Sequence, residues 1–186
     1  FVSGNSYTGS HNTSFSVVRY GNVMGSRGSV IPFFISIKGK QLFPITDNRM
    51  TRFMISLEEG VKLVWHAFDD MKGGEIYVKK ISSMKVTDIA LAVDENTKQE
   101  EVGIRPGEKL HEQMIGIEDA LYTYEYPENF KILPSINDWA KDEARIGDGI
   151  RVPEDFTYTS NNNKEWMEIS ELKEWIKKNK SKIGNI

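Results

Sequence analysis

The sequence predicts an α/β fold, because segments typical of strands and of helices alternate along its first half. Residues 14–23 are rich in β-branched and aromatic side chains and end in Gly-Asn, a pattern typical of a strand. The apolar spacing at 31–38 indicates a helix. A longer helix at 57–71, a strand at 75–80 and a helix at 84–93 complete the alternation.

The helix at 57–71 has the clearest local signals. Ser56 and Glu59 have the spacing of a capping box at its start. An apolar stripe then recurs at helical spacing, at Val61, Val64, Trp65 and Phe68. Gly73-Gly74 ends the helix, and the next strand follows directly.

The second half of the chain is less regular. Residues 100–135 contain an Arg-Pro-Gly-Glu turn and an aromatic stretch, and residues 136–165 are polar and loop-like. A last amphipathic helix is expected from Ser170 to about Lys178. Its inward side chains are expected to be Leu172, Trp175 and Ile176.

Composition excludes several classes of protein. The chain has 186 residues with 24 Lys and Arg against 27 Asp and Glu, and this net charge of -3 argues against a protein that binds nucleic acid through its phosphates. Because there is no cysteine, a disulfide scaffold, thiol catalysis and Cys-ligated metals are excluded. No apolar run reaches the roughly 18 residues of a transmembrane helix, and no signal-peptide pattern is found in the opening residues. A soluble, cytoplasmic protein without membrane contact is expected.

The sequence contains no recognisable catalytic or metal centre. His11, His66 and His111 are far apart, and none belongs to an H-E-x-x-H pattern. No G-x-S-x-G motif marks a serine nucleophile. We therefore expect neither metal ligands nor catalytic residues in this chain.

Arginines in constrained segments are the clearest chemical signal. Arg27 lies in a glycine-rich loop, where backbone N–H groups can approach a phosphate. Arg52 follows a Pro-Ile-Thr-Asp turn, and Arg105 is held in an R-P-G-E turn beside Glu108. A planar arginine fork suits pyrophosphate, and a carboxylate suits sugar hydroxyls. Each arginine alone could equally be a solvated surface residue.

Multi-residue strings resemble one family in that family's own order: RYGNVMGSRGSVIPFF, PITDNRMTRF, SLEEGV, GGEIYV, IRPGEKLHEQMI and DFTYTSNNNKEW. The family is that of the inverting UDP-N-acetylglucosamine 4,6-dehydratases, extended short-chain dehydrogenases/reductases that make the first intermediate toward pseudaminic acid. The resemblance spans nearly all 186 residues. It implies an NAD(P)-binding Rossmann fold with a smaller α/β substrate-binding domain, NADP as cofactor, UDP-N-acetylglucosamine or a related UDP-sugar as substrate, and a homo-oligomer.

The resemblance also implies which residues bind. The expected substrate contacts are Asn22 near the phosphates, Pro44, Ile45 and Thr46 against uracil, Arg52 and Arg105 at the pyrophosphate, and Glu108 at the ribose hydroxyls. The residues expected near the nicotinamide end of the cofactor are Tyr20, Gly21, Val23, Ser26 and Arg27. Tyr20 could instead be a core aromatic residue at the end of a strand.

Two motifs of the family do not occur in this sequence: the G-x-x-G-x-x-G that cradles the NADP pyrophosphate and the catalytic Tyr-x-x-x-Lys. Together with the apolar opening at Phe1, this predicts about the C-terminal half of the enzyme, inactive alone. Remaining Rossmann elements are expected at 1–30 and 56–81, and the substrate-binding domain at 31–55 and 82–186. This half of the enzyme is expected to bind the UDP part of the substrate.

Two alternatives remain open from the sequence. One is a fragment of an epimerase or reductase that acts on another UDP-sugar, because the segment carrying the acid and base decides the reaction. The other is a nucleotide-sugar binding module without catalysis.

Overall fold

The computed structural model describes residues 2–40, 42–135 and 141–184. The chain divides into two compact units, each made from three stretches of sequence. The first unit comprises Phe1–Tyr20, Glu58–Lys80 and Gln113–Tyr158, and the second comprises Gly21–Leu57, Ile81–Glu112 and Thr159–Ile186.

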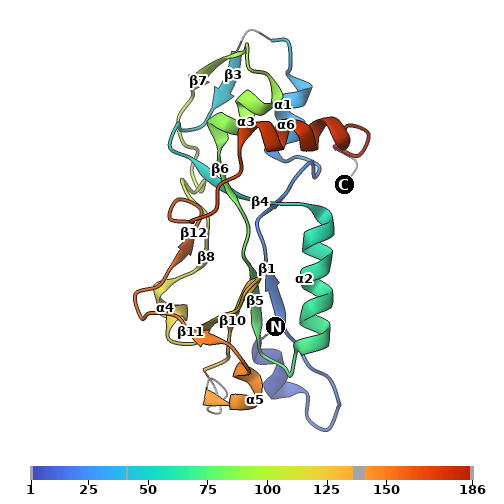
Figure 1. Cartoon of the computed structure of the whole chain (residues 1–186), viewed down its shortest axis with the longest axis vertical. Helices are drawn as coiled ribbons and strands as arrows, with labels where there is room; N and C mark the ends of the chain where they lie inside the picture. Colours follow the sequence, from blue (N-terminus) through green and yellow to red (C-terminus); the bar gives the residue numbers. More distant parts are fainter. Residues whose placement is uncertain (1, 41, 136–140, 185–186) are drawn as a thin grey trace. The chain divides into compact units, whose positions relative to one another are not determined.

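A five-stranded sheet forms the centre of the first unit (Figure 1). Its strands lie in the order β1 (Val17–Arg19), β5 (Ile76–Lys79), β10 (Asn129–Ile132), β9 (Thr123–Glu125) and β11 (Ile150–Arg151). The pair β1 and β5 is parallel, and the other neighbours are antiparallel. The unit also contains η1 (Val2–Tyr7), β8 (Gln113–Ile115), α4 (Ile117–Ala120), α5 (Glu143–Ile146) and nearly all of α2 (Leu57–Asp70).

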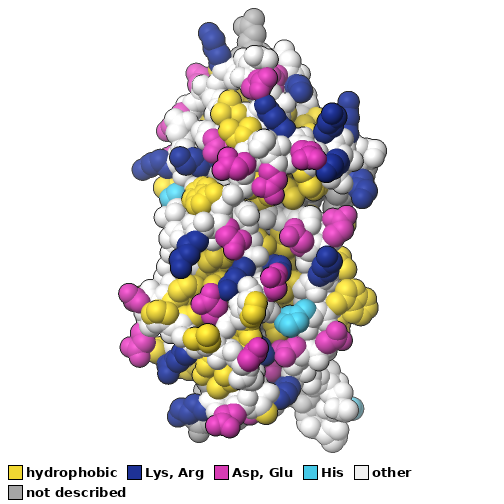
Figure 2. Space-filling view, viewed as in Figure 1, with side chains coloured by type: hydrophobic (Ala, Val, Ile, Leu, Met, Phe, Trp, Pro, Cys, Tyr) yellow, Lys and Arg dark blue, Asp and Glu magenta, His cyan; other side chains and the backbone are white. Residues whose placement is uncertain are grey.

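Helix α2 packs on this sheet through its smaller residues. Leu63 and Ala67 pack against the fully buried Tyr77 of β5, and Gly60 is buried as well. The apolar stripe seen in the sequence is not the buried face: the exposed fractions are 46% for Val61 and 64% for both Trp65 and Phe68. Figure 2 shows apolar side chains open at the surface over α2. Leu63 and Ala67 therefore form the contact with the sheet, and the large rings lie outside it.

The second unit is built from short strands and three helices around one core. Strand β2 (Asn22–Val23) is parallel to β4 (Thr51–Ile55), which is antiparallel to β6 (Ser83–Lys85), and β3 (Leu42–Ile45) is parallel to β7 (Lys98–Glu101). The helices are α1 (Val30–Ser36), α3 (Val86–Val93) and α6 (Ile169–Lys178), and β12 (Tyr158–Thr159) precedes the last of them. Helix α3 packs against both α1 and α6, and Figure 1 shows α6, in red, beside α3.

Most of the predicted elements are confirmed with small shifts of their ends. The helices at 57–71, 84–93 and 170–178 are α2, α3 and α6, and Leu172 of α6 is fully buried. The strand expected at 14–23 is instead two short strands in different sheets. Gly21 lies between them and beside β4: a Cβ there would lie 2.4 Å from the Cβ of Phe53, so only glycine allows this approach.

Two expectations differ from the structure in the second half of the chain. Residues 113–158 were assigned with the substrate-binding domain, but they pack in the first unit because β10 and β9 extend the sheet from β5. The stretch 136–165 was expected to be loop-like, yet it contains α5, β11 and β12. Residues 136–140 of that stretch lie outside the described residues.

Candidate functional site

A cavity of about 400 Å³ lies within the second unit. This volume is in the range of small-molecule sites in proteins. The cavity is lined by residues from β2, the loop before α1, α1, β3, β4, α3 and the turn after β7: Asn22, Gly28, Ser29, Val30, Phe33, Phe34, Pro44, Thr46, Met50, Arg52, Val86, Val102, Arg105 and Glu108. Six of the seven residues predicted to contact substrate are among them.

Ile45 is the predicted substrate residue that does not line the cavity. It is fully buried in the core of the second unit, as is Phe43. Side chains of a strand alternate between its two faces, so in β3 Phe43 and Ile45 point one way and Pro44 the other. The strand therefore presents Pro44, and Thr46 just after it, to the cavity.

Arg52 is held by main-chain oxygens at the cavity wall. Its side chain is only 16% exposed. Nη1 donates hydrogen bonds to the backbone oxygens of Thr51 at 2.7 Å and of Leu110 at 3.3 Å. Nη2 also donates to the sulfur of Met50 at 3.0 Å. The guanidinium is therefore fixed at the cavity wall, where its positive charge can attract an anion.

Glu112 is a carboxylate beside Arg52 that the sequence analysis did not assign. Its Oε1 lies 4.0 Å from Nε of Arg52, and its Oε2 accepts the backbone N–H of Phe53 at 2.7 Å. Burial raises the pKa of the Glu112 carboxyl, although the Phe53 N–H, Arg52 and a hydrogen bond with Asn22 oppose this. Glu112 thus joins Asn22 and Arg52 in one polar network. It follows directly after His111 in the IRPGEKLHEQMI string, which is the signal that could have identified it.

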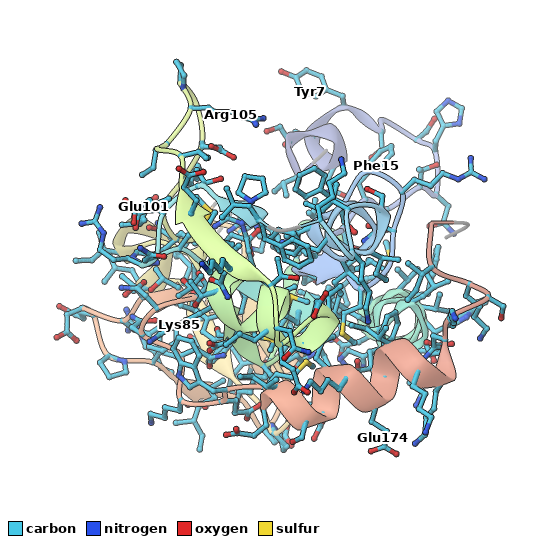
Figure 3. All side chains as sticks on the ribbon, turned by 90° about the horizontal axis from the view of Figure 1, so that it is seen from above. Tyr7, Phe15, Lys85, Glu101, Arg105 and Glu174 are labelled. Carbon is cyan, nitrogen blue, oxygen red and sulfur yellow. The ribbon has the colours of Figure 1, made fainter. Side chains whose placement is uncertain are left out.

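The predicted R-P-G-E turn is present and brings Arg105 and Glu108 to the cavity. Glu108 N–H donates to the backbone oxygen of Arg105 at 3.0 Å, and Oε2 of Glu108 accepts the N–H of Arg105 at 3.0 Å. Gly107 adopts a φ of 85°, which favours glycine. Figure 3 shows Arg105 on the loop that follows β7. Among the described residues, the Arg105 guanidinium has no hydrogen-bond or ion-pair partner, so it is available to a ligand.

Aromatic and apolar side chains complete the cavity. Phe34 is buried and stacks on Phe43 with ring centroids 5.0 Å apart, whereas the neighbouring Phe33 is 45% exposed and lines the cavity. Met50 and Val86 add buried apolar surface. The combination of flat apolar surface with two arginines and two polar acceptors suits an anion attached to a ring system.

The residues predicted to contact the cofactor do not line this cavity. Gly21 is required by the packing of β2 beside β4, and Nε of Arg27 donates to the backbone oxygen of Gly184 at 3.2 Å. Ser26 forms the turn before α1, where its backbone oxygen accepts from the hydroxyl of Ser29 at 2.7 Å. Val23 of β2 pairs with Ile55 of β4, and Tyr20, in the first unit, is 42% exposed. The expected cofactor contacts of these five residues stay predictions.

A cluster of hydrogen-bonded side chains stabilises β4, whose Arg52 lines the cavity. The hydroxyl of Thr51 lies 2.8 Å from Nδ1 of His111 and 2.6 Å from the hydroxyl of Ser160. Burial lowers the pKa of His111, and the nearby charges of Arg49 and Arg52 add to this. Arg49 forms a two-bond pair with Asp47, at 2.7 and 3.0 Å, and holds the pKa of that carboxyl at about 2. Arg49 does not line the cavity.

In the described ranges, no group of histidine and acidic side chains is arranged to hold a metal ion. The same ranges contain no helix with the length and apolar character needed to cross a membrane.

Comparison with known proteins places the chain in a family. The sequence profile described as Polysaccharide biosynthesis protein matches residues 1–134. Two Campylobacter jejuni proteins named UDP-N-acetylglucosamine 4,6-dehydratase (inverting) are each 49% identical to the chain, over 95% and 92% of it and over 55% and 54% of their own lengths. A UDP-glucose 4-epimerase from Rickettsia rickettsii is 37% identical over 88% of this chain and 49% of its own length.

A solved structure supports the expected fold. The X-ray structure of Pen from Bacillus thuringiensis matches with a TM-score of 0.79 and 33% identity, over 95% of this chain and 52% of that one. The chain spans about half the length of the curated relatives it matches. The fold class predicted from the sequence is confirmed: the architecture is that of the Rossmann-like extended short-chain dehydrogenases/reductases. Because the profile match covers well over half of its residues, the chain belongs to the polysaccharide biosynthesis protein family.

Proposed function

We propose that this chain is the UDP-sugar-binding part of a C5-inverting UDP-N-acetylglucosamine 4,6-dehydratase that acts toward pseudaminic acid. One observation carries the proposal: six of the seven residues expected at the substrate line a single cavity of about 400 Å³. The identity of 49% to two Campylobacter jejuni proteins of that name supports the choice of reaction.

The cavity offers a contact for each part of the nucleotide. Arg52 and Arg105 supply planar forks for the pyrophosphate, and Asn22 supplies an amide beside them. Glu108 accepts ribose hydroxyls, and the uracil ring lies against Pro44 and Thr46. Binding energy from this remote half of the substrate then positions the sugar for the chemical steps.

NADP is proposed on the resemblance, with Tyr20, Gly21, Val23, Ser26 and Arg27 near its nicotinamide end. At Gly21, where a missing side chain could have admitted a cofactor, the space is filled by Phe53. The whole protein's use of NADP and its homo-oligomeric state therefore rest on the resemblance, and the hydride and proton transfers are assigned to no residue of this chain.

The proposal is tested on the complete gene product with UDP-N-acetylglucosamine and NADP. We expect mass spectrometry to show a nucleotide sugar lighter by one water, and solvent deuterium to enter at C5. The Arg105→Ala variant should raise KM more than it lowers kcat, because Arg105 contacts the non-reacting half of the substrate. A product of unchanged mass would contradict the dehydratase assignment.

A second candidate reaction is 4-epimerisation of a UDP-sugar, which the 37% identity to a Rickettsia rickettsii UDP-glucose 4-epimerase favours. The same assay separates the two, because an epimer keeps the mass of the substrate. If the complete protein binds the UDP-sugar without converting it, the non-catalytic binding module is the correct alternative.

A further inference from the structure

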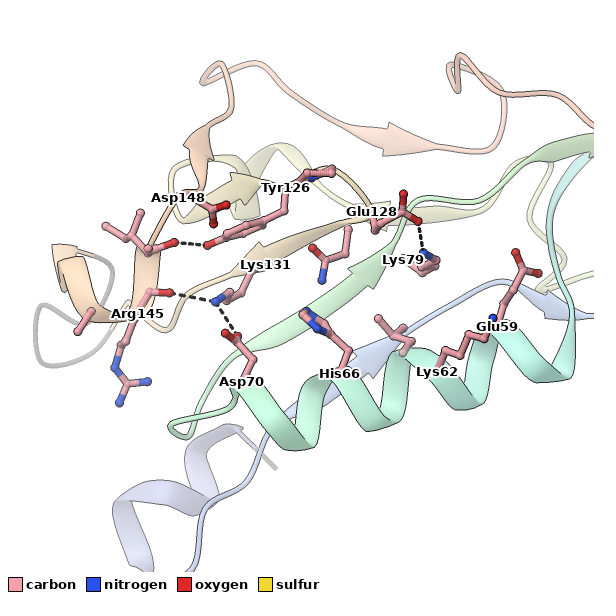
Figure 4. Close-up of a pocket in the computed structure, with 16 residues that line it drawn as sticks. Glu59, Lys62, His66, Asp70, Lys79, Tyr126, Glu128, Lys131, Arg145 and Asp148 are labelled. Carbon is pink, nitrogen blue, oxygen red and sulfur yellow. Dashed lines mark hydrogen bonds and ion pairs between the residues drawn. The ribbon is translucent and has the colours of Figure 1, made fainter.

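A second cavity, of about 620 Å³, lies within the first unit (Figure 4). Its walls come from α2, from β5 and β10, from the turn between β9 and β10, and from α5 with the turn after it. No residue of the candidate UDP-sugar cavity and none of the predicted site residues lines it. A ligand in this cavity would therefore be independent of the proposed function.

Most charges around this cavity are already paired. Lys79 and Glu128 form an ion pair at 2.9 Å. Nζ of Lys131 donates to Asp70 at 2.7 Å and to the backbone oxygen of Arg145 at 3.0 Å. Burial alone would raise the pKa of the Asp70 carboxyl, but hydrogen bonds from Lys131 and Tyr77 outweigh it and keep that pKa below its usual value. The floor of the cavity is thus fixed and close to neutral.

Asn129 presents an unused amide to the cavity. The residue is only 5% exposed, lies on β10 and lines the cavity. No described residue forms a hydrogen bond with its side chain. Every fully buried side-chain polar atom of the described residues does have a hydrogen-bond partner, so the polar atoms of the Asn129 side chain are not fully buried. The amide must therefore be open to the cavity itself. A polar group that is buried and unpaired in this way is costly unless water or a ligand meets it.

Two further donors stand on α2. Lys62 and His66 are one turn apart, so they project from the same face of the helix, and Figure 4 shows both at the cavity. At 3.6 residues per turn, each of them lies about 100° around the helix from the apolar residue before it, Val61 or Trp65. The two donors therefore stand on a different flank of α2 from the exposed apolar stripe.

The opposite wall of the cavity is flat and apolar. The hydroxyl of Tyr126 donates to the backbone oxygen of Ile146 at 2.7 Å, and Nζ of Lys131 lies 4.9 Å from the centre of the Tyr126 ring, so the ring is held in place. Pro127 continues this surface. A planar group can pack on such a wall with little loss of side-chain freedom.

We propose that this cavity binds a small organic anion, with a phosphate or carboxylate group at Lys62, His66 and Asn129 and a flat apolar body against Tyr126. The two remaining lining carboxylates lie at its ends, with Glu59 beside Lys62 and Asp148 beside Tyr126 (Figure 4). They limit the site to a compact ligand with a single anionic group and disfavour an extended polyanion.

The test is a titration of the ¹⁵N-labelled 186-residue chain, followed by NMR, with phenyl phosphate, benzoate and inorganic phosphate. We expect saturable shifts of the Asn129 side-chain amide and of the Lys62 and His66 backbone amides with one or both aromatic probes. The aromatic probe that binds more tightly shows whether the site prefers a phosphate or a carboxylate group. If inorganic phosphate binds as tightly as phenyl phosphate, the apolar wall takes no part and the proposed flat body is wrong.

Charge-reversal variants supply the control. Lys62→Glu should weaken binding of the aromatic probe at least about tenfold, because it replaces a donor with a repelling charge on an exposed helix position. The matched variant Lys98→Glu, on the exposed strand β7 of the second unit, should leave binding unchanged. Asn129→Asp should also abolish binding. Equal effects of Lys62→Glu and Lys98→Glu, or probe shifts confined to the second unit, would overturn the proposal, whereas UDP binding is expected to survive Lys62→Glu.

Discussion

Arg52 and Arg105 line the same cavity but are prepared differently for a ligand. Arg52 is largely buried and tied to two backbone oxygens, whereas Arg105 stands on an exposed turn without a partner among the described residues. A guanidinium that is fixed in advance loses little freedom on binding. A free one gains its first partner from the ligand, so its loss should appear almost entirely in ligand affinity and not in stability.

Replacing Arg105 by alanine should weaken UDP binding by about 2 kcal/mol or more, the range expected when one partner of a desolvated charge pair is removed. The matched control is Arg49→Ala, because Arg49 is paired with Asp47 and does not line the cavity. Isothermal titration calorimetry of both variants measures the difference. Equal affinities of Arg105→Ala and the unmodified chain would remove Arg105 from the site.

Glu112 predicts a particular pH dependence of stability. Burial raises the pKa of its carboxyl above the ordinary 4.5. The folded chain therefore holds an extra proton between pH 4.5 and that raised value, and the contribution of Glu112 to stability is lost as the pH rises through this window. The Glu112→Gln variant has no titratable group at this position and does not lose this contribution. The difference between its free energy of unfolding and that of the unmodified chain, variant minus unmodified, should therefore increase from pH 4.5 toward neutrality. Denaturant unfolding at several pH values tests this, and a difference that decreases with pH would contradict it.

Among the elements, α2 was predicted correctly as a helix, but the face that it buries was not. Capping signals and glycines fixed its ends, and the helix observed at Leu57–Asp70 agrees with them. The buried face was missed because Leu63 and Ala67, which pack against Tyr77, carry a weaker hydrophobic signal together than Trp65 and Phe68, which are exposed. Apolar spacing reports every surface that a helix could bury, not only the one buried within this unit.

Substitutions on the two faces of α2 should therefore differ in their effect on stability. Ala67→Leu inserts bulk into the contact with Tyr77 and should lower the free energy of unfolding by about 1–3 kcal/mol. Trp65→Ser, on the exposed face, should change it by no more than about 0.5 kcal/mol. Chemical denaturation of both variants gives the comparison, and a larger loss for Trp65→Ser would mean that the ring is buried in solution.

Strand β3, at the candidate site, is a second element for which the sequence pattern did not show which side chains are buried. The resemblance assigned Pro44, Ile45 and Thr46 together, although a strand cannot present three consecutive side chains to one surface. The structure keeps Pro44 and Thr46 at the cavity and buries Ile45. Family strings thus pointed to residues that line one cavity, except Ile45, and the backbone geometry decided which side chains of β3 reach it. Phe33 and Glu112 were missed because their importance depends on contacts between distant parts of the sequence.

For the whole molecule, the sequence predicted the α/β class, the longer helices and a common sheet for the strands at 14–23 and 75–80, but not that β10 and β9 extend this sheet. Residues 113–158 carry no strong periodic pattern, and their place in the first unit depends on long-range pairing of β10 with β5. Such pairing is decided by tertiary contacts that local patterns do not contain. The sequence analysis expected two interleaved domains, but the place of residues 113–158 in the first unit was beyond its reach.

The exposed apolar face of α2 and the position of β1 at one edge of the sheet predict that the 186-residue chain associates with itself. Sedimentation velocity should show species larger than a monomer. The double variant Trp65→Ser, Phe68→Ser should shift the distribution toward the monomer without loss of helix content. A sharp monomer peak for the unmodified chain at micromolar concentration would contradict this prediction.

The most direct test of the central claim is a titration of the ¹⁵N-labelled 186-residue chain with UDP. If the cavity of the second unit holds the UDP half of the substrate, saturable shifts will appear at Asn22, Thr46, Arg105 and Glu108, and Arg105→Ala will weaken them together. The amides around Asn129 and His66 will stay in place. An absence of saturable binding, or shifts that leave the cavity residues unmoved, would contradict the assignment.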